Sequence, residues 1–156
     1  MKCDWKKLAL AVAIPLAVGG LSAVLTMDNM IMFDAVKKPP LSPPKWLFPA
    51  AWTVLYVLMG IASCLVYTAD APSGKKRSSL IVYAVSLVFN FLWSIIFFNL
   101  DNYLLAFVWL CALWIFIVIV TVQFFGIRKS AGWFMLPYIL WVGFAGYLNF
   151  GIYLLN

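Results

Sequence analysis

Five stretches of about 20 mostly apolar residues occupy most of the chain, at 8–26, 46–68, 80–98, 103–127 and 132–155. A helix needs about 20 such residues to cross the hydrocarbon core of a bilayer. Hydrophobic residues make up 66 % of the 156 residues and charged residues only 10 %, a balance that a soluble domain of this length could not bury. The sequence predicts an all-α membrane protein, a single domain over 1–156 that forms a five-helix transmembrane bundle. Because most connections are short, we expect consecutive helices to be antiparallel neighbours.

The first apolar segment has an alternative interpretation as a signal peptide. Lysines precede it, and residues 21–23 loosely resemble a cleavage site. The apolar run is long for a signal peptide, however, and small or polar residues recur on one helix face, as is typical of closely packed membrane helices. These residues are Pro15, Gly19, Ser22 and Thr26. We therefore expect a retained transmembrane helix.

The basic residues predict an orientation. With five spans, one side collects Lys2, Lys6, Lys7, Lys75, Lys76, Arg77, Arg128 and Lys129, and the other only Lys37, Lys38 and Lys45. Lysine and arginine are retained on the cytoplasmic side. We expect a bacterial plasma membrane, with the amino terminus cytoplasmic and the carboxyl terminus outside. Because these charges lie in short gaps between apolar runs, they indicate anionic lipid and not nucleic acid as the partner.

The loop between the first two spans is the longest and contains four prolines. Proline cannot continue a helix and restricts the residue before it, so this loop should be stiff and extended. We expect it to act as a lid over the mouth of the bundle, although a simple connector is the alternative. The lid residues would be Phe33, Pro39, Pro43 and Pro44.

Aromatic and polar side chains recur at helical spacing on one face of three spans. They are Trp52 and Tyr56 in the second, Asn90, Trp93 and Phe97 in the third, and Tyr138, Trp141, Ala145 and Leu148 in the fifth. An unpaired amide at Asn90 would cost several kcal/mol in lipid, so it should bond another helix, a water or a ligand. The pattern predicts a pocket for a flat, mostly apolar ligand. The alternative is that these rings are membrane-interface belts.

No familiar catalytic set is present. Histidine is absent, there is no Gly-rich phosphate loop, and all five acidic residues fall in loops or at span ends. We therefore predict no metal site. A proton-driven pump usually places a carboxylate in mid-membrane, so active transport is disfavoured.

The joint order of several short motifs resembles one family over essentially the whole chain. The motifs are Lys38-Pro39 with Pro43-Pro44, residues 52–56 (WTVLY) with Met59-Gly60, residues 90–94 (NFLWS) with Phe97-Phe98, and residues 136–138 (LPY) with Trp141, Ala145, Leu148 and Asn149. They resemble the tryptophan-rich sensory protein family (TspO/MBR), which includes the translocator protein, or peripheral benzodiazepine receptor.

The resemblance implies a bundle that binds tetrapyrroles such as protoporphyrin IX among its helices, beneath the first loop. The matching ligand-binding positions are Trp52, Asn90, Trp93, Tyr138, Trp141, Ala145 and Leu148, to which the aromatic stripes add Tyr56 and Phe97. No covalent cofactor is implied, and family members often form homodimers. Some bacterial members promote light-dependent porphyrin breakdown, and the two tryptophans credited with it match Trp52 and Trp141. Phe33, Leu41 and Ser86 depart from the family's usual Tyr, Trp and Gln.

These observations predict a membrane tetrapyrrole-binding sensor or regulator. A porphyrin-degrading enzyme that acts through Trp52 and Trp141, a porphyrin or small-molecule transporter, and a partner-binding membrane protein are the alternatives. The sequence leaves the natural ligand and the oligomeric state open.

Overall fold

The structure, a computed structural model, describes residues 4–32 and 35–156, and within these ranges all regular structure is helical. Its helices are α1 Trp5–Met32, α2 Leu47–Tyr67, α3 Ser73–Ser94, α4 Tyr103–Ile127 and α5 Lys129–Leu155, and the π-helix η2 Ile95–Asn99 continues α3. Five spans in the described ranges are long and apolar enough to cross a membrane. The prediction of an all-α, five-helix membrane protein is therefore confirmed.

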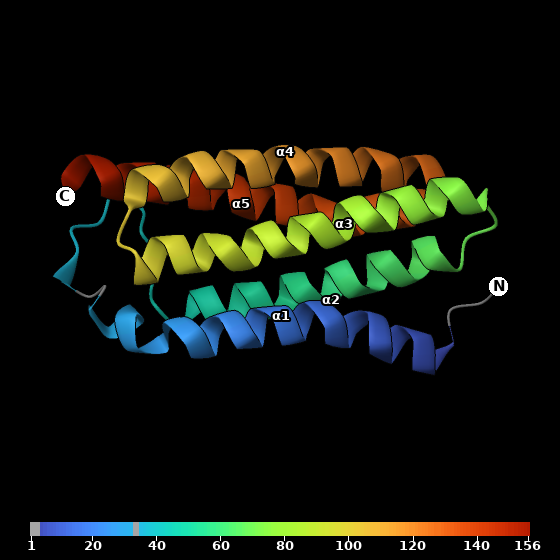
Figure 1. Ribbon diagram of the computed structural model, residues 1–156, viewed down its shortest axis with the longest axis horizontal. Helices are drawn as coiled ribbons and strands as arrows, with labels where there is room; N and C mark the ends of the chain where they lie inside the picture. Colours follow the sequence, from blue (N-terminus) through green and yellow to red (C-terminus); the bar gives the residue numbers. More distant parts are fainter. Residues whose placement is uncertain (1–3, 33–34) are drawn as a thin grey trace.

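The helices run along one axis, so the two ends of the chain lie at opposite ends of the bundle (Figure 1). Helix α1 packs against α2, α2 against α5, α5 against α4, and α4 against α3. Contacts of α3 and η2 with α1 close the ring. Although α2 and α3 follow one another in the sequence, they contact each other little. This pair differs from the expectation that consecutive helices pack together, and the ring leaves room between α2 and α3.

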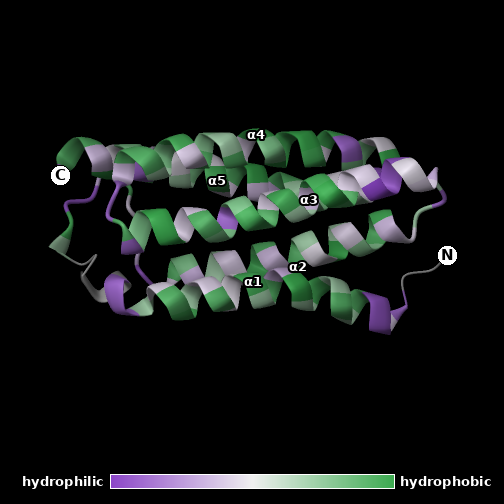
Figure 2. Cartoon of the chain, in the orientation of Figure 1, coloured by the Kyte–Doolittle hydropathy of each residue, from purple (hydrophilic) through white to green (hydrophobic). Residues whose placement is uncertain are grey.

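The helix bounds follow the apolar segments most closely where polar residues cap the ends. Helix α4 coincides with the predicted span, and the Asn102 side chain caps it by accepting a hydrogen bond from the Leu105 amide at 3.0 Å. Helix α3 begins at Ser73, seven residues before the predicted span, because its polar first turns lie beyond the apolar run. Figure 2 shows these hydrophilic turns at the ends of α1 and α3 and apolar residues along the middle.

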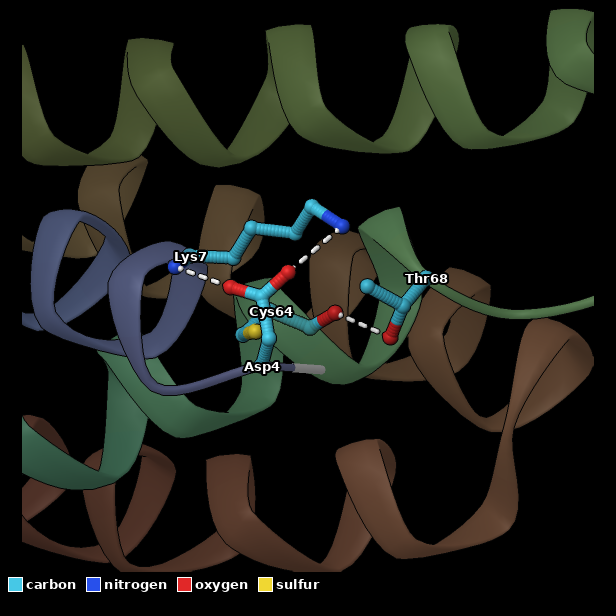
Figure 3. A network of polar contacts seen from close by, with 4 residues as sticks. All are labelled: Asp4, Lys7, Cys64 and Thr68. Atoms are coloured by element: carbon cyan, nitrogen blue, oxygen red, sulfur yellow. Dashed lines mark hydrogen bonds and ion pairs between the residues drawn. The ribbon is translucent and has the colours of Figure 1, made fainter. Parts of the chain in front are cut away.

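Polar side chains bond to the start of α1 and the end of α2, at the end of the bundle that holds the amino terminus (Figure 3). The Asp4 carboxylate accepts a hydrogen bond from the Lys7 amide at 3.0 Å and pairs with the Lys7 ammonium at 2.9 Å. These two contacts hold the pKa of the Asp4 carboxyl below its ordinary value. At the end of α2, the Thr68 hydroxyl donates to the Cys64 carbonyl at 2.8 Å.

Helices α1 and α2 approach closely because glycines face the partner helix. A Cβ added at Gly60 would collide with the backbone of α1 at Ala11 and Val12. A Cβ at Gly19 would collide with the ring of Tyr56. Small residues allow such close packing where lipid supplies no hydrophobic drive for helix association. Within the predicted small-residue face of the first span, Gly19 therefore packs against a neighbouring helix.

Candidate ligand-binding cavity

A cavity of about 510 Å³ lies toward the end of the bundle that holds the carboxyl terminus, beneath the loop that joins α1 to α2. We call it the main cavity. Residues of α1, α2, α3, η2 and α5 form its walls, and loop residues Lys38, Ser42, Pro43 and Lys45 lie at its mouth. Its volume falls within the range of about 300–1,000 Å³ typical of small-molecule pockets.

Aromatic rings from neighbouring helices form one wall of the main cavity. The Trp52 ring lies 5.6 Å from the Tyr56 ring and nearly parallel to it, and 6.3 Å from the Trp93 ring. Phe97 continues the wall, with its centroid 5.5 Å from that of Trp93. Four residues of the predicted site therefore share one wall, and Ala145 and Leu148 of α5 line the cavity as well.

A buried chain of hydrogen bonds lies behind this wall. The Tyr56 hydroxyl donates to Asn90 Oδ1 at 2.9 Å, and Asn90 Nδ2 donates to the Tyr138 hydroxyl at 2.9 Å. Asn90 is 1 % exposed and Tyr138 is fully buried, and neither lines the main cavity. The structure thus gives Asn90 the interhelical partners that its position requires. It places Asn90 and Tyr138 as supports of the Tyr56 ring, not in the cavity wall.

A second chain fixes the indole of Trp93. Its Nε1 donates to Asn149 Oδ1 at 3.2 Å, and Asn149 Nδ2 donates to the Tyr103 carbonyl at 2.8 Å. These bonds tie α3, α5 and α4 together beside the cavity. The indole N–H of Trp93 is thus satisfied by the protein, and its ring lines the cavity.

Trp141 lies outside the wall, although it shares the spacing pattern of Trp52. Its ring packs edge-on against Phe48, with the centroids 6.0 Å apart, and Phe48 is the residue that lines the cavity. The indole N–H of Trp141 is buried and has no hydrogen-bond partner in the described part of the chain. The structure therefore separates the two tryptophans that sequence reasoning had put together.

Helix α1 forms a wall that the sequence analysis missed. The cavity is lined by Leu16, Gly19, Gly20, Ser22, Ala23 and Thr26 of this helix. The buried Thr26 hydroxyl donates to the Ser22 carbonyl at 2.9 Å, which satisfies it within the helix. A signal for this wall was present in the sequence, in the small residues of the first span. Small residues allow close helix packing, as at Gly60, but they leave empty space where the neighbouring helix is farther away.

The loop over the cavity is tied to α5. The Tyr147 hydroxyl donates to the Pro40 carbonyl at 2.9 Å, and Asn156 exchanges two hydrogen bonds with the Lys37 backbone at 3.0 and 2.9 Å. Pro39 is buried against Gly151. Of the predicted lid residues, Pro43 lines the cavity, Pro44 is exposed and does not, and Phe33 lies outside the described residues.

One side of the main cavity reaches the surface of the bundle. Gly20 and Ala23 on α1, and Pro49 and Thr53 on α2, line the cavity and are also exposed. We call this opening the α1–α2 slot. On the other flank of α1, Asn99 of η2 donates to the Leu25 carbonyl at 3.0 Å and accepts from Asn29 at 2.9 Å. These bonds join α1 to η2 on the flank of α1 opposite the slot.

Comparison with known proteins identifies the family of this chain. The model of the TspO/MBR family matches residues 11–155. The chain belongs to the TspO/MBR family. It is 36 % identical to the tryptophan-rich protein TspO of Chlorobaculum tepidum over 96 % of this chain and 95 % of that protein. It is 34 % identical to the tryptophan-rich sensory protein of Cereibacter sphaeroides over 100 % and 95 %.

More distant TspO/MBR relatives include the translocator protein of Bos taurus, at 27 % identity over 88 % of this chain and 82 % of that protein. The resemblance drawn from the sequence motifs is thereby confirmed. This TspO/MBR member is an integral membrane protein whose lipid environment follows from its five apolar helices.

Proposed function

We propose that this TspO/MBR protein is a membrane sensor or regulator that binds a planar tetrapyrrole of the protoporphyrin IX class in the main cavity. The observation that carries the proposal is the aromatic wall of Trp52, Trp93 and Phe97 beside a cavity of about 510 Å³. Flat, apolar macrocycles stack on such rings. Lys38 and Lys45 line the mouth, where the carboxylates of such a ligand would meet water.

Replacing Trp52 by leucine is expected to weaken protoporphyrin IX binding about tenfold, because one stacking face and its contact area are lost. Trp141→Phe should leave affinity nearly unchanged, because Trp141 packs against Phe48 and does not itself line the cavity. Titration of the purified protein with protoporphyrin IX, followed by tryptophan fluorescence quenching, measures both effects.

Trp133→Leu is the matched control, since Trp133 is 65 % exposed at the amino-terminal end of α5. Equal Kd values for wild type and Trp52→Leu, or no saturable quenching at all, would contradict the proposal. Absorbance of the complex in the dark and under light, compared with protoporphyrin IX in detergent alone, separates binding from degradation, because an enzyme gives porphyrin loss under light beyond the photobleaching of the free porphyrin.

We infer that the amino-terminal end of the bundle faces the cytoplasm of a bacterial plasma membrane. Among the described residues this end holds Lys6, Lys7, Lys75, Lys76, Arg77, Arg128 and Lys129. Such an excess of basic residues is typical of the cytoplasmic side. In intact cells, a membrane-impermeant maleimide should label Leu41→Cys and not Asp70→Cys, each measured against the unsubstituted protein. The reverse labelling would overturn the orientation.

A further inference from the structure

A second cavity, of about 250 Å³, lies at the amino-terminal end of the bundle, between the first turns of α3 and the last turns of α4. It is lined by Lys75, Ser78 and Ser79 of α3 and by Gln123, Gly126 and Ile127 of α4. We call it the α3–α4 groove. It shares no lining residue with the main cavity and has no part in the function proposed above.

The depth of the groove places it at the border between acyl chains and headgroups. Helix α4 has 25 residues and is therefore about 37 Å long, against a hydrocarbon core of about 30 Å. Gln123 lies four residues before the end of α4, or about 6 Å along the axis. A ligand in the groove would therefore be a molecule that resides in this boundary layer.

Two polar groups of the groove have no hydrogen-bond partner among the described residues, whereas the Ser79 hydroxyl donates to the Lys75 carbonyl at 2.9 Å. Within the described ranges, the Lys75 ammonium makes no hydrogen bond or ion pair. The neighbouring Lys76 differs, because its ammonium donates to two carbonyls at the end of α2. On the facing helix, Gln123 Oε1 is buried and has no donor among the described residues. The groove therefore needs an anion beside Lys75 and a hydrogen-bond donor beside Gln123.

The charge around the groove also favours an anion. The described residues at this end carry seven basic side chains and two acidic ones, Asp4 and Asp70, which gives a net charge of 7 − 2 = +5. The ion pair between Lys7 and Asp4 neutralises one charge of each sign at this end. Anionic lipids are attracted to such juxtamembrane clusters by about 1 kcal/mol per basic residue.

We propose that the α3–α4 groove binds the headgroup of an anionic glycerophospholipid with a hydroxyl beyond its phosphate, as in phosphatidylglycerol. The phosphate accepts hydrogen bonds from the Lys75 ammonium and the Ser78 hydroxyl. The headgroup hydroxyl donates to Gln123 Oε1. At Gly126 an added Cβ would meet no atom within 4 Å, so there is space for the glycerol backbone above Ile127.

Native mass spectrometry of the full chain, released from nanodiscs of equal parts phosphatidylcholine and phosphatidylglycerol, tests the site. Wild type should retain phosphatidylglycerol in preference to phosphatidylcholine. Lys75→Gln should reduce the retained fraction about fivefold, the effect of one basic residue at an anionic surface. The control is Lys129→Gln, which removes a charge at the same end but does not line the groove, and it should retain phosphatidylglycerol like wild type.

The headgroup hydroxyl is tested with phosphatidylmethanol, which has the same charge but no donor. Wild type should prefer phosphatidylglycerol over phosphatidylmethanol, and Gln123→Leu should lose that preference while still favouring both over phosphatidylcholine. Equal losses in Lys75→Gln and Lys129→Gln would overturn the proposal, since they would show only diffuse attraction to the basic end. Displacement of the lipid by inorganic phosphate at equal concentration would also overturn it, because the groove would then bind free phosphate.

Discussion

Replacing Gly60 by alanine is expected to destabilise the protein by about 2 to 3 kcal/mol, within the usual cost of an overpacked core. The added methyl group would collide with the backbone of α1 at Ala11 and Val12, and a backbone cannot rotate away as a side chain can. Helices α1 and α2 would therefore have to separate. Unfolding in detergent, followed by intrinsic fluorescence during heating and during titration with SDS, measures the loss.

Gly74→Ala is the matched control for this prediction. Gly74 lies in the first turn of α3, where an added Cβ would meet no atom within 4 Å. Alanine should leave stability unchanged there or raise it slightly, because it has a higher helix propensity than glycine. Similar unfolding midpoints for the two variants would show that α1 and α2 are not in close contact at Gly60.

Removing the amide of Asn90 is expected to have the second largest effect on stability. Asn90→Ala breaks the hydrogen bonds to Tyr56 and Tyr138 and leaves two buried hydroxyls without their partner, at a cost of about 2 kcal/mol. Because the Tyr56 ring lines the main cavity, the same variant should also loosen the aromatic wall. The unfolding free energy in SDS titration measures the first effect.

A double-mutant cycle separates the hydrogen bonds from lost packing. In a background that carries Tyr56→Phe and Tyr138→Phe, both phenol partners of Asn90 are already gone. Asn90→Ala should then cost less, by an interaction energy of about 0.5 to 1.5 kcal/mol for each bond. If the cost is the same in both backgrounds, the hydrogen bonds contribute nothing measurable, and only the volume of the amide matters.

The helical architecture could be predicted because hydropathy measures what a bilayer demands of each segment. The predicted span 103–127 coincides with α4, whose ends are set by Asn102 and Arg128. Turns beyond the apolar run could not be predicted in this way, since water allows both helix and coil there. For that reason α3 begins at Ser73 rather than at residue 80.

The candidate site could be predicted only as a set of side chains that face inward. Trp52 and Trp141 both lie on aromatic helix faces of the predicted site, yet Trp52 lines the cavity and Trp141 packs against the lining residue Phe48. The Asn90 side chain was expected to find a hydrogen-bond partner. That Tyr56 is this partner depends on how three helices pack, which the spacing pattern alone does not determine. The π-helix η2 has no signature in the sequence, because it depends on contacts such as the bond from Asn99 to the Leu25 carbonyl of α1.

The α1–α2 slot affects how affinity has to be expressed for this protein. Gly20 and Thr53 line the main cavity and are exposed on the flank of two apolar helices, so a guest that enters there would come from the acyl chains and not past the loop. Occupancy then follows the mole fraction of the guest in the bilayer. Doubling the lipid at constant protein and guest dilutes the guest and empties the cavity, even though the aqueous volume is unchanged.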